Sequence, residues 1–165
     1  MDLTRTHHFD HPIDEVWAML HHVDAHVAKF DHMGHRDIVV VSSEVSDDAI
    51  DLTIKRVLDI DVPSVARKIL KPTNTVTSTD HWERAADGGC AGHYEVDIKG
   101  VPVDSHGTTK VVADDDGEGC TYTIDLAVKV KVPLIGDKIA GALRGQLEKQ
   151  IDSEFDACEA WLGSK

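Results

Sequence analysis

The stretch that decides the fold is Thr121-Tyr-Thr-Ile-Asp-Leu-Ala-Val-Lys-Val-Lys-Val-Pro133, together with the segment that follows it as far as Leu162. Up to Val132, apolar and polar residues alternate with the period of a half-buried strand. After Pro133, apolar residues return at three- and four-residue steps for about seven turns, which predicts an amphipathic helix. A strand that runs directly into a long closing helix indicates a curved antiparallel sheet that grips one helix, with a cavity between them.

The predicted helix has one apolar face and three internal glycines. The face consists of Ile139, Leu143, Leu147, Ile151, Phe155, Cys158 and Leu162. Gly136, Gly141 and Gly145 each cost a helix interior about 1 kcal/mol. They predict either tight packing of the helix on the sheet or space for a ligand beside it.

Further elements are predicted upstream of this pair. A strand over residues 3–9 precedes Pro12. One helical stripe then follows, with a possible break near residues 22–24, and consists of Ile13, Trp17, Leu20, Val23 or Asp24, Val27 and Phe30. Gly34 ends this helical region. Alternating segments at 37–45, 50–60, 73–84, 94–98 and 103–113 predict more strands, and residues 64–70 predict a helical turn or lid loop. Short turns favour an antiparallel meander of roughly seven strands, and the absence of repeats or linkers favours a single domain over residues 1–165.

Four segments carry a resemblance to a known family. Pro12-Ile-Asp-Glu-Val-Trp17 resembles the first helix of the helix-grip superfamily, also called START-like, Bet v 1-like or SRPBCC. More narrowly, the chain is similar to the actinobacterial DUF2505 proteins, through Thr73-Asn-Thr-Val-Thr-Ser-Thr-Asp-His-Trp82, Ile98-Lys-Gly-Val-Pro-Val103 and Val128-Lys-Val-Lys-Val-Pro-Leu-Ile-Gly-Asp-Lys-Ile139. The resemblance implies an α+β helix-grip fold. It implies no catalytic residues, because the superfamily hosts carriers, cyclases and chaperones alike.

Composition excludes several classes of function. The net charge of −13 should repel phosphate backbones and anionic lipid heads, so neither nucleic-acid binding nor stable membrane association is expected. No apolar run approaches the roughly 20 residues of a membrane span. The N-terminus has no apolar signal region, which predicts a cytoplasmic protein. Cys90, Cys120 and Cys158 lack disulfide or zinc spacing and are expected to be small buried residues.

A cavity under the final helix would have predictable walls. The candidates are Ile54, Arg56, Tyr94, Val96, Ile98, Ile124, Leu126 and Val128 on the sheet, and Ile139, Leu143 and Leu147 on the helix. Arg56 could meet a ligand carboxylate or phosphate, or it could reach the rim or pair with an Asp. The Tyr94 hydroxyl could serve a ligand, or the ring could pack with its tip in water.

Eight of the 11 histidines lie in the first 35 residues. His22 and His26 have the i, i+4 spacing of two metal ligands on a helix, but no third ligand is fixed by the sequence. Solvated surface histidines that titrate near neutral pH are the favoured interpretation. We predict no bound metal and no cofactor.

Three functions are compatible with these patterns. The first is non-enzymatic binding or transport of a small hydrophobic or amphipathic molecule in the cavity. The second is a polyketide cyclase or aromatase that uses the same cavity, although Asp80, His81 and Glu83 lack an evident orienting partner. The third is a protein-interaction module with a filled core.

Overall fold

One antiparallel sheet of seven strands dominates the structure, a computed structural model that describes all residues from Met1 to Lys165. The strand order is β1-β7-β6-β5-β4-β3-β2. The elements are β1 (Asp2–Phe9), α1 (Ile13–Leu20), α2 (Val23–His32), β2 (Arg36–Val45), β3 (Ala49–Asp59), the 3₁₀ turn η1 (Ser64–Ala66), β4 (Thr73–Arg84), β5 (Cys90–Ile98), β6 (Val103–Ala113), β7 (Cys120–Val130) and α3 (Gly136–Gly163).

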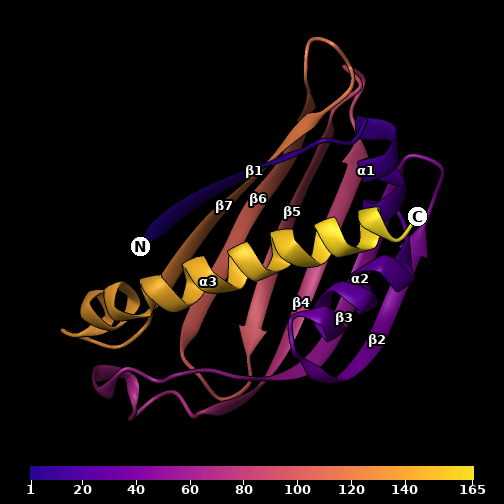
Figure 1. Cartoon of the computed structure of the whole chain (residues 1–165). Coiled ribbons are helices and arrows are strands. Elements are labelled where there is room, and N and C mark those ends of the chain that lie inside the picture. Colours follow the sequence, from indigo (N-terminus) through magenta and orange to yellow (C-terminus); the bar gives the residue numbers. More distant parts are fainter.

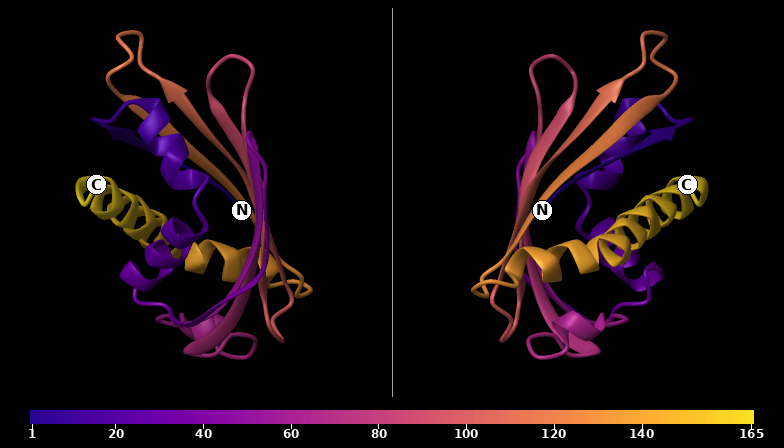
Figure 2. Two further views of the ribbon diagram at one scale, coloured as in Figure 1. Left: turned by 90° about the vertical axis from the view of Figure 1, so that its right-hand side faces the viewer. Right: turned by 90° about the vertical axis from the view of Figure 1, so that its left-hand side faces the viewer.

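The three helices lie on one side of the curved sheet. In Figure 1, α3 crosses the strands over most of the sheet's width, and Figure 2 shows α1 and α2 on the same side as α3. Each strand from β2 to β6 pairs with the next one in the chain, through short connections except for residues 60–72 between β3 and β4, and β1 pairs with β7 to complete the order. The predicted helix-grip fold is confirmed.

The corner between β7 and α3 needs one of the three helix glycines. A Cβ at Gly136 would lie 2.2 Å from the carbonyl oxygen of Val130, so the helix can begin close to the strand only with glycine there. Gly141 and Gly145 are exposed and have open space where a Cβ would be. The expectation that these two permit packing or make room for a ligand is therefore wrong.

A break divides the first helical region, as the pattern allowed. α1 ends at Leu20, and α2 begins at Val23, where the ring of His22 accepts a hydrogen bond from the backbone N–H of Asp24. The interruption changes the helical phase, so the predicted single stripe is only partly right. Val16, Met19, Leu20, Ala25, His26 and Phe30 are buried, whereas Ile13, Trp17 and Val27 are only half-buried.

Two separate apolar clusters form the core. The larger cluster has the aromatic side chains of Phe9, Trp82, Tyr122 and Phe155 among its members. The smaller joins η1 to the first turns of α3 and contains Ala66, Leu70, Val130, Ile139, Ala140 and Leu143. The three cysteines are buried and free. None of the helices combines the length and apolar character that a membrane-spanning helix needs.

Candidate ligand cavity

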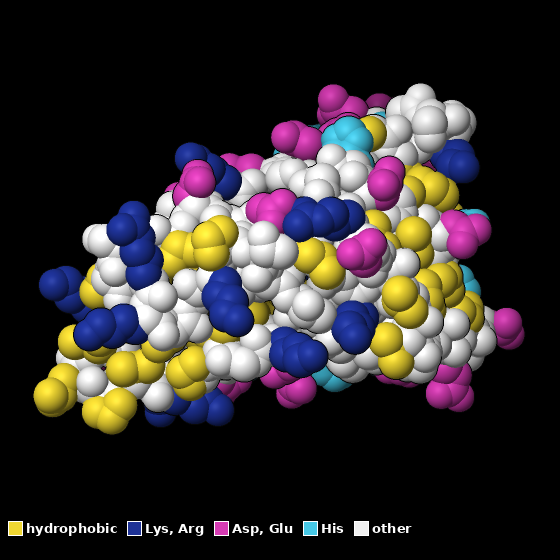
Figure 3. Space-filling model, turned by 90° about the horizontal axis from the view of Figure 1, so that it is seen from below, with side chains coloured by type: hydrophobic (Ala, Val, Ile, Leu, Met, Phe, Trp, Pro, Cys, Tyr) yellow, Lys and Arg dark blue, Asp and Glu magenta, His cyan; other side chains and the backbone are white.

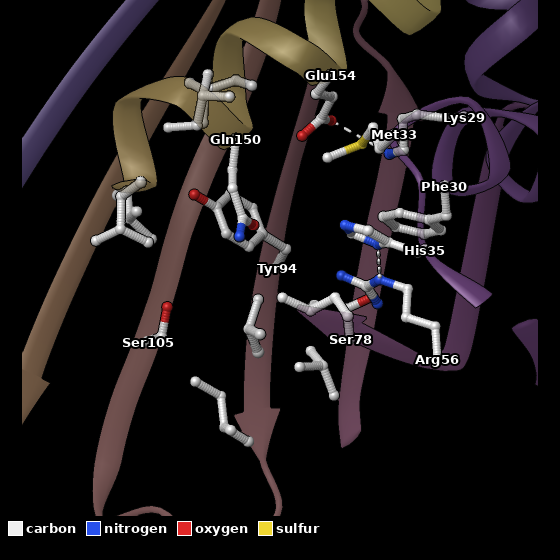
Figure 4. A pocket seen from close by; sticks show the side chains of 18 of the residues that line it. Lys29, Phe30, Met33, His35, Arg56, Ser78, Tyr94, Ser105, Gln150 and Glu154 are labelled. Carbon is white, nitrogen blue, oxygen red and sulfur yellow. Dashed lines mark hydrogen bonds and ion pairs between the residues drawn. The ribbon is translucent and has the colours of Figure 1, made fainter. Parts of the chain in front are cut away.

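A cavity of about 190 Å³ lies between the helices α2 and α3 and the concave face of the sheet. A space of this size holds on the order of ten water molecules, or a small organic molecule. The lining is mostly apolar. α3 contributes Leu143, Leu147, Gln150 and Glu154, which recur at the three- and four-residue spacing of one helix face. Figure 4 shows part of this lining, with charged side chains gathered at one end.

Most of the predicted wall residues are found in this lining. Those that line the cavity are Arg56, Tyr94, Val96, Ile98, Ile124, Leu126, Leu143 and Leu147. Ile54 and Val128 are buried in the larger apolar cluster instead. Ile139 packs in the smaller cluster, because the first turn of α3 closes against η1 and leaves no space there. A role of the lining residues in ligand contact stays a prediction.

Arg56 lies inside the molecule at the charged end of the cavity. Its side chain is 6% exposed, so it is not at the rim. Nε donates to Nδ1 of His35 at 3.1 Å, and Nη1 donates to Oγ of Ser78 at 2.7 Å. The guanidinium carbon lies 3.7 Å from the centroid of the Phe30 ring. Arg56 forms no ion pair with a carboxylate, and Nη2 donates to no group of the chain.

His35 is held in its neutral form by this arrangement. Nδ1 accepts the hydrogen bond from Arg56, and the imidazole stacks on Phe30 with the ring centroids 5.6 Å apart. Burial, helped by the neighbouring positive charge of Arg56, lowers the pKa of His35 to about 4. Burial also lowers the pKa of Arg56, to about 10. The guanidinium therefore remains charged at neutral pH, and its hydrogen-bond acceptors are uncharged.

Two carboxyl groups and a lysine complete the charged end. Lys29 Nζ lies 3.2 Å from Oε1 of Glu154, and the lysine side chain is 12% exposed. Burial opposes the charge of Lys29, but Glu154 and Asp80 outweigh it and raise the pKa of the ammonium group. Burial raises the pKa of Asp80, although Lys29 and Arg56 work in the opposite direction. Lys29 thus has a hydrogen-bonded counter-ion, whereas Arg56 does not.

Tyr94 reaches the cavity from β5 but its hydroxyl has a partner in the chain. The hydroxyl donates to the backbone carbonyl of Asp125 at 3.2 Å. The side chain crosses β6 at Gly107, where a Cβ would lie 2.5 Å from the tyrosine oxygen. Burial raises the pKa of Tyr94. The ring therefore lines the cavity in a position that Gly107 leaves free and that the hydrogen bond to Asp125 fixes.

The other polar candidates lie away from the cavity or have structural roles. His81 is on the outer face of β4, where Nδ1 pairs with Asp51 at 2.8 Å. His22 caps α2, and the ring of His26 points inward and donates from Nε2 to the carbonyl of Leu20 at 2.7 Å. The expectation of a surface position is thus wrong for His26, and for His35 as well, because both are buried. No group of three or more His, Cys, Asp or Glu side chains is placed to hold a metal ion.

Sequence reasoning missed much of the charged end. Ser78 and Asp80 lie between Val76 and Trp82 in a series of every second residue, which forms the inward face of β4. This two-residue period could have placed both polar residues inside. Glu154 follows Ile151 by three residues on the inner face of α3. No sequence signal joins these residues to Lys29 and His35, because α2 and the turn that follows it bring these two in from a distant part of the chain.

A curved antiparallel sheet around one long helix, with a mostly apolar cavity between them, defines a helix-grip protein. A protein of Thermus thermophilus shares this fold with a TM-score of 0.71 at 10% identity, over 99% of this chain and 98% of that one. Human STARD10 matches with a TM-score of 0.60 at 12% identity, over 95% of this chain and 62% of its own. Norcoclaurine synthase from Thalictrum flavum, in complex with dopamine and hydroxybenzaldehyde, matches with a TM-score of 0.59 at 13% identity, over 100% and 88% of the two chains. Such low identities show the fold alone.

The sequence also identifies the family. Residues 4–162 match the family described as "Protein of unknown function (DUF2505)", and the chain belongs to it. The predicted resemblance is confirmed over nearly the whole chain. No curated protein matches the sequence.

Proposed function

We propose that this protein binds a small amphipathic molecule in the cavity without transforming it, and that the ligand carries an acidic head group. The observation that carries the proposal is the buried Arg56 guanidinium, whose Nη2 has no partner in the chain. Removing a cation from water is costly unless an anion compensates it. Asp80 and Glu154 favour the charge of Arg56 without a hydrogen bond to it, and a ligand carboxylate or phosphate at Nη2 would supply a directly bonded anion.

The remainder of the lining suits the apolar part of such a ligand. Val96, Ile98 and Leu126 face the cavity from β5 and β7, and Leu143 and Leu147 face it from α3. Burial of apolar surface contributes about 25 cal/mol per Å² and would provide most of the affinity. Norcoclaurine synthase, which has the same fold, is known in complex with two small aromatic molecules, and this supports a ligand of similar size here.

A cyclase remains the second candidate, and one observation favours it. Asp80 is a cavity-lining carboxyl group whose pKa is raised by burial, as a general acid requires. However, the raised pKa of Lys29 keeps that amine protonated and unsuited to nucleophilic attack. His81 faces outward. A filled-core interaction module does not account for the cavity.

The test is ligand binding with matched head groups. Short-chain and monocyclic aromatic carboxylates are compared with the corresponding alcohols by isothermal titration calorimetry. Replacement of Arg56 by Gln should weaken carboxylate binding about 10- to 100-fold, the usual value of a hydrogen bond to a charged group, and leave alcohol binding nearly unchanged. Arg36→Gln is the matched control, because Arg36 is exposed and pairs with Asp59 at the surface.

Two outcomes would contradict different parts of the proposal. If acids and alcohols bind equally and Arg56→Gln changes neither affinity, the ligand needs no acidic head group, but the proposal that the cavity binds a ligand still stands. If no compound binds and none shifts the melting temperature, ligand binding itself is wrong. Turnover of any bound compound would favour the cyclase.

A further inference from the structure

The positive charges of this acidic protein are concentrated at one end. Residues 64–72 and 129–138 contain six Lys and Arg residues and a single acidic residue, in a chain whose net charge is −13. The six are Arg67, Lys68, Lys71, Lys129, Lys131 and Lys138. We call these two segments the basic tip. Figure 3 shows Lys and Arg side chains gathered with hydrophobic side chains at the left end of the face seen from below.

The fold brings the two segments of the basic tip together. η1 packs against α3, and the smaller apolar cluster joins Ala66 and Leu70 to Val130 and Ile139. These buried contacts hold the lysines and arginines of both segments around one surface. The juxtaposition depends on tertiary structure, because about 60 residues of chain separate the segments.

Apolar side chains protrude from the middle of the basic tip. Leu134 has the largest exposure of the large hydrophobic residues, at 105%, and Ile135 is 41% exposed. Pro133 is exposed as well. The backbone of Leu134 has a φ of +72°, a left-handed conformation that leucine adopts only at an energetic cost. Neither packing nor backbone preference within the chain explains a leucine at this position.

We propose that the basic tip docks reversibly on membrane surfaces that contain anionic lipid, with the side chains of Leu134 and Ile135 entering the lipid layer. Lysines near an anionic bilayer each contribute about fivefold to binding, and inserted aliphatic groups add to this. A nucleic acid would use the same charges but would gain little from a protruding leucine, and the basic tip has no aromatic side chain on which bases could stack.

The negative net charge of the chain does not prevent this docking. Charges on exposed groups are screened beyond about 8 Å at physiological ionic strength, so a membrane senses the nearest residues rather than the whole protein. The sequence-based expectation of repulsion treats the charge as evenly spread. Leu70 and Leu143 belong both to the apolar cluster beneath the basic tip and to the cavity lining. A docked protein would thus hold one end of its cavity close to the membrane.

The test is sedimentation with sucrose-loaded vesicles. Vesicles of equimolar phosphatidylserine and phosphatidylcholine should bind the protein, pure phosphatidylcholine should not, and about 1 M salt should abolish binding. Leu134→Ser should weaken binding roughly tenfold or more, and Lys131→Gln and Lys138→Gln about fivefold each. Val112→Ser and Lys110→Gln are matched controls, since both residues are exposed on β6 outside the basic tip.

Leu134→Gly separates docking from folding. It should relieve the left-handed backbone and keep or raise the melting temperature, yet lose binding as Leu134→Ser does. Failure to bind phosphatidylserine vesicles above the phosphatidylcholine background would overturn the proposal. So would binding that is equally sensitive to the control variants. Binding to phosphatidylserine vesicles and to a single-stranded oligonucleotide alike, with no effect of Leu134→Ser, would show a general polyanion site instead.

Discussion

The sheet and α3 enclose two regions that differ in how they are filled. In the packed region, the rings of Phe9, Trp82 and Phe155 surround Tyr122, with centroids 5.4 to 6.3 Å from its ring. In the cavity region, the sheet and helix face each other mainly through aliphatic side chains such as Val96 and Leu147, and space remains between them. Aromatic rings therefore fill the space between the sheet and α3 in the packed region, whereas part of that space stays open in the cavity region.

This difference shows how the chain maintains a cavity. Aromatic residues make up only 5% of the sequence, and half of them form the packed region. Phe30 and Tyr94 also line the cavity, but Phe30 lies against Arg56 and the Tyr94 hydroxyl bonds to Asp125, so their rings are not part of the packed contact with α3. Valine and leucine are too short to meet across the space between a curved sheet and a helix, whereas tyrosine and tryptophan can span it. Trp82 and Tyr122 belong to both regions and form the boundary. Stability should therefore depend on the packed region, and binding on the cavity region.

The largest effect is expected in the packed region. Phe155 is buried, lies edge-on to Tyr122 at 5.4 Å and stacks on His7 at 5.1 Å. Phe155→Ala should lower the free energy of unfolding by about 3–5 kcal/mol, measured by urea denaturation. Val96→Ala, in the cavity lining, should cost about 1 kcal/mol. Similar losses for the two variants would show that the regions are equally well packed.

The buried histidines should give a pH-dependent effect, which for His26 is about 2 kcal/mol at pH 5 and therefore smaller there than that of Phe155→Ala. Burial, with the nearby charge of Lys29, lowers the pKa of His26 to about 3 from the ordinary 6.5. Below pH 6.5 the unfolded chain therefore binds a proton at this histidine that the folded protein does not bind. The free energy of unfolding should fall by about 1.4 kcal/mol for each pH unit, until the pKa of His26 in the folded protein is reached.

Comparison of variants isolates this contribution from that of the carboxylates. His26→Gln can keep the hydrogen bond to the carbonyl of Leu20 while removing the titration. Its unfolding free energy should fall less steeply with pH than that of the wild type. His32→Gln, at an exposed position of α2, should leave the slope unchanged. His35, whose pKa is lowered only to about 4, should contribute over a narrower pH range. Parallel slopes for His26→Gln and the wild type would contradict the buried position of His26.

The fold was predictable because its signals are local. Alternation through Ile124, Leu126 and Val128 gives the strand, and the three- and four-residue spacing after Pro133 gives the helix. Most of the apolar cavity lining follows from the same two periods. The helix phase after His22 was not predictable, because it depends on where the chain leaves the helix for two residues.

The charged end of the cavity could not be derived in the same way. Lys29, Asp80 and Glu154 come from three elements, and charged residues are normally expected at the surface. Alternation along β3 and β4 places Arg56 and Asp80 on the inward faces, but it does not show which groups from the helices meet them. The basic tip could not be predicted for a related reason. The net charge is a sum over the whole chain, and it does not show which charged residues the fold places on the same face.

The most closely matched comparison of the packed region with the cavity region uses one isoleucine from each. Ile54 and Ile124 are both buried, but only Ile124 lines the cavity. Ile54→Ala should cost about 4 kcal/mol and Ile124→Ala about 2 kcal/mol, because a side chain beside existing space makes fewer contacts that can be lost. A carboxylate ligand at saturating concentration should stabilise the wild type and Ile54→Ala equally, and Ile124→Ala less, since this variant loses ligand contacts. Equal costs for the two isoleucines, with equal stabilisation by ligand, would mean that the space beside Ile124 is filled.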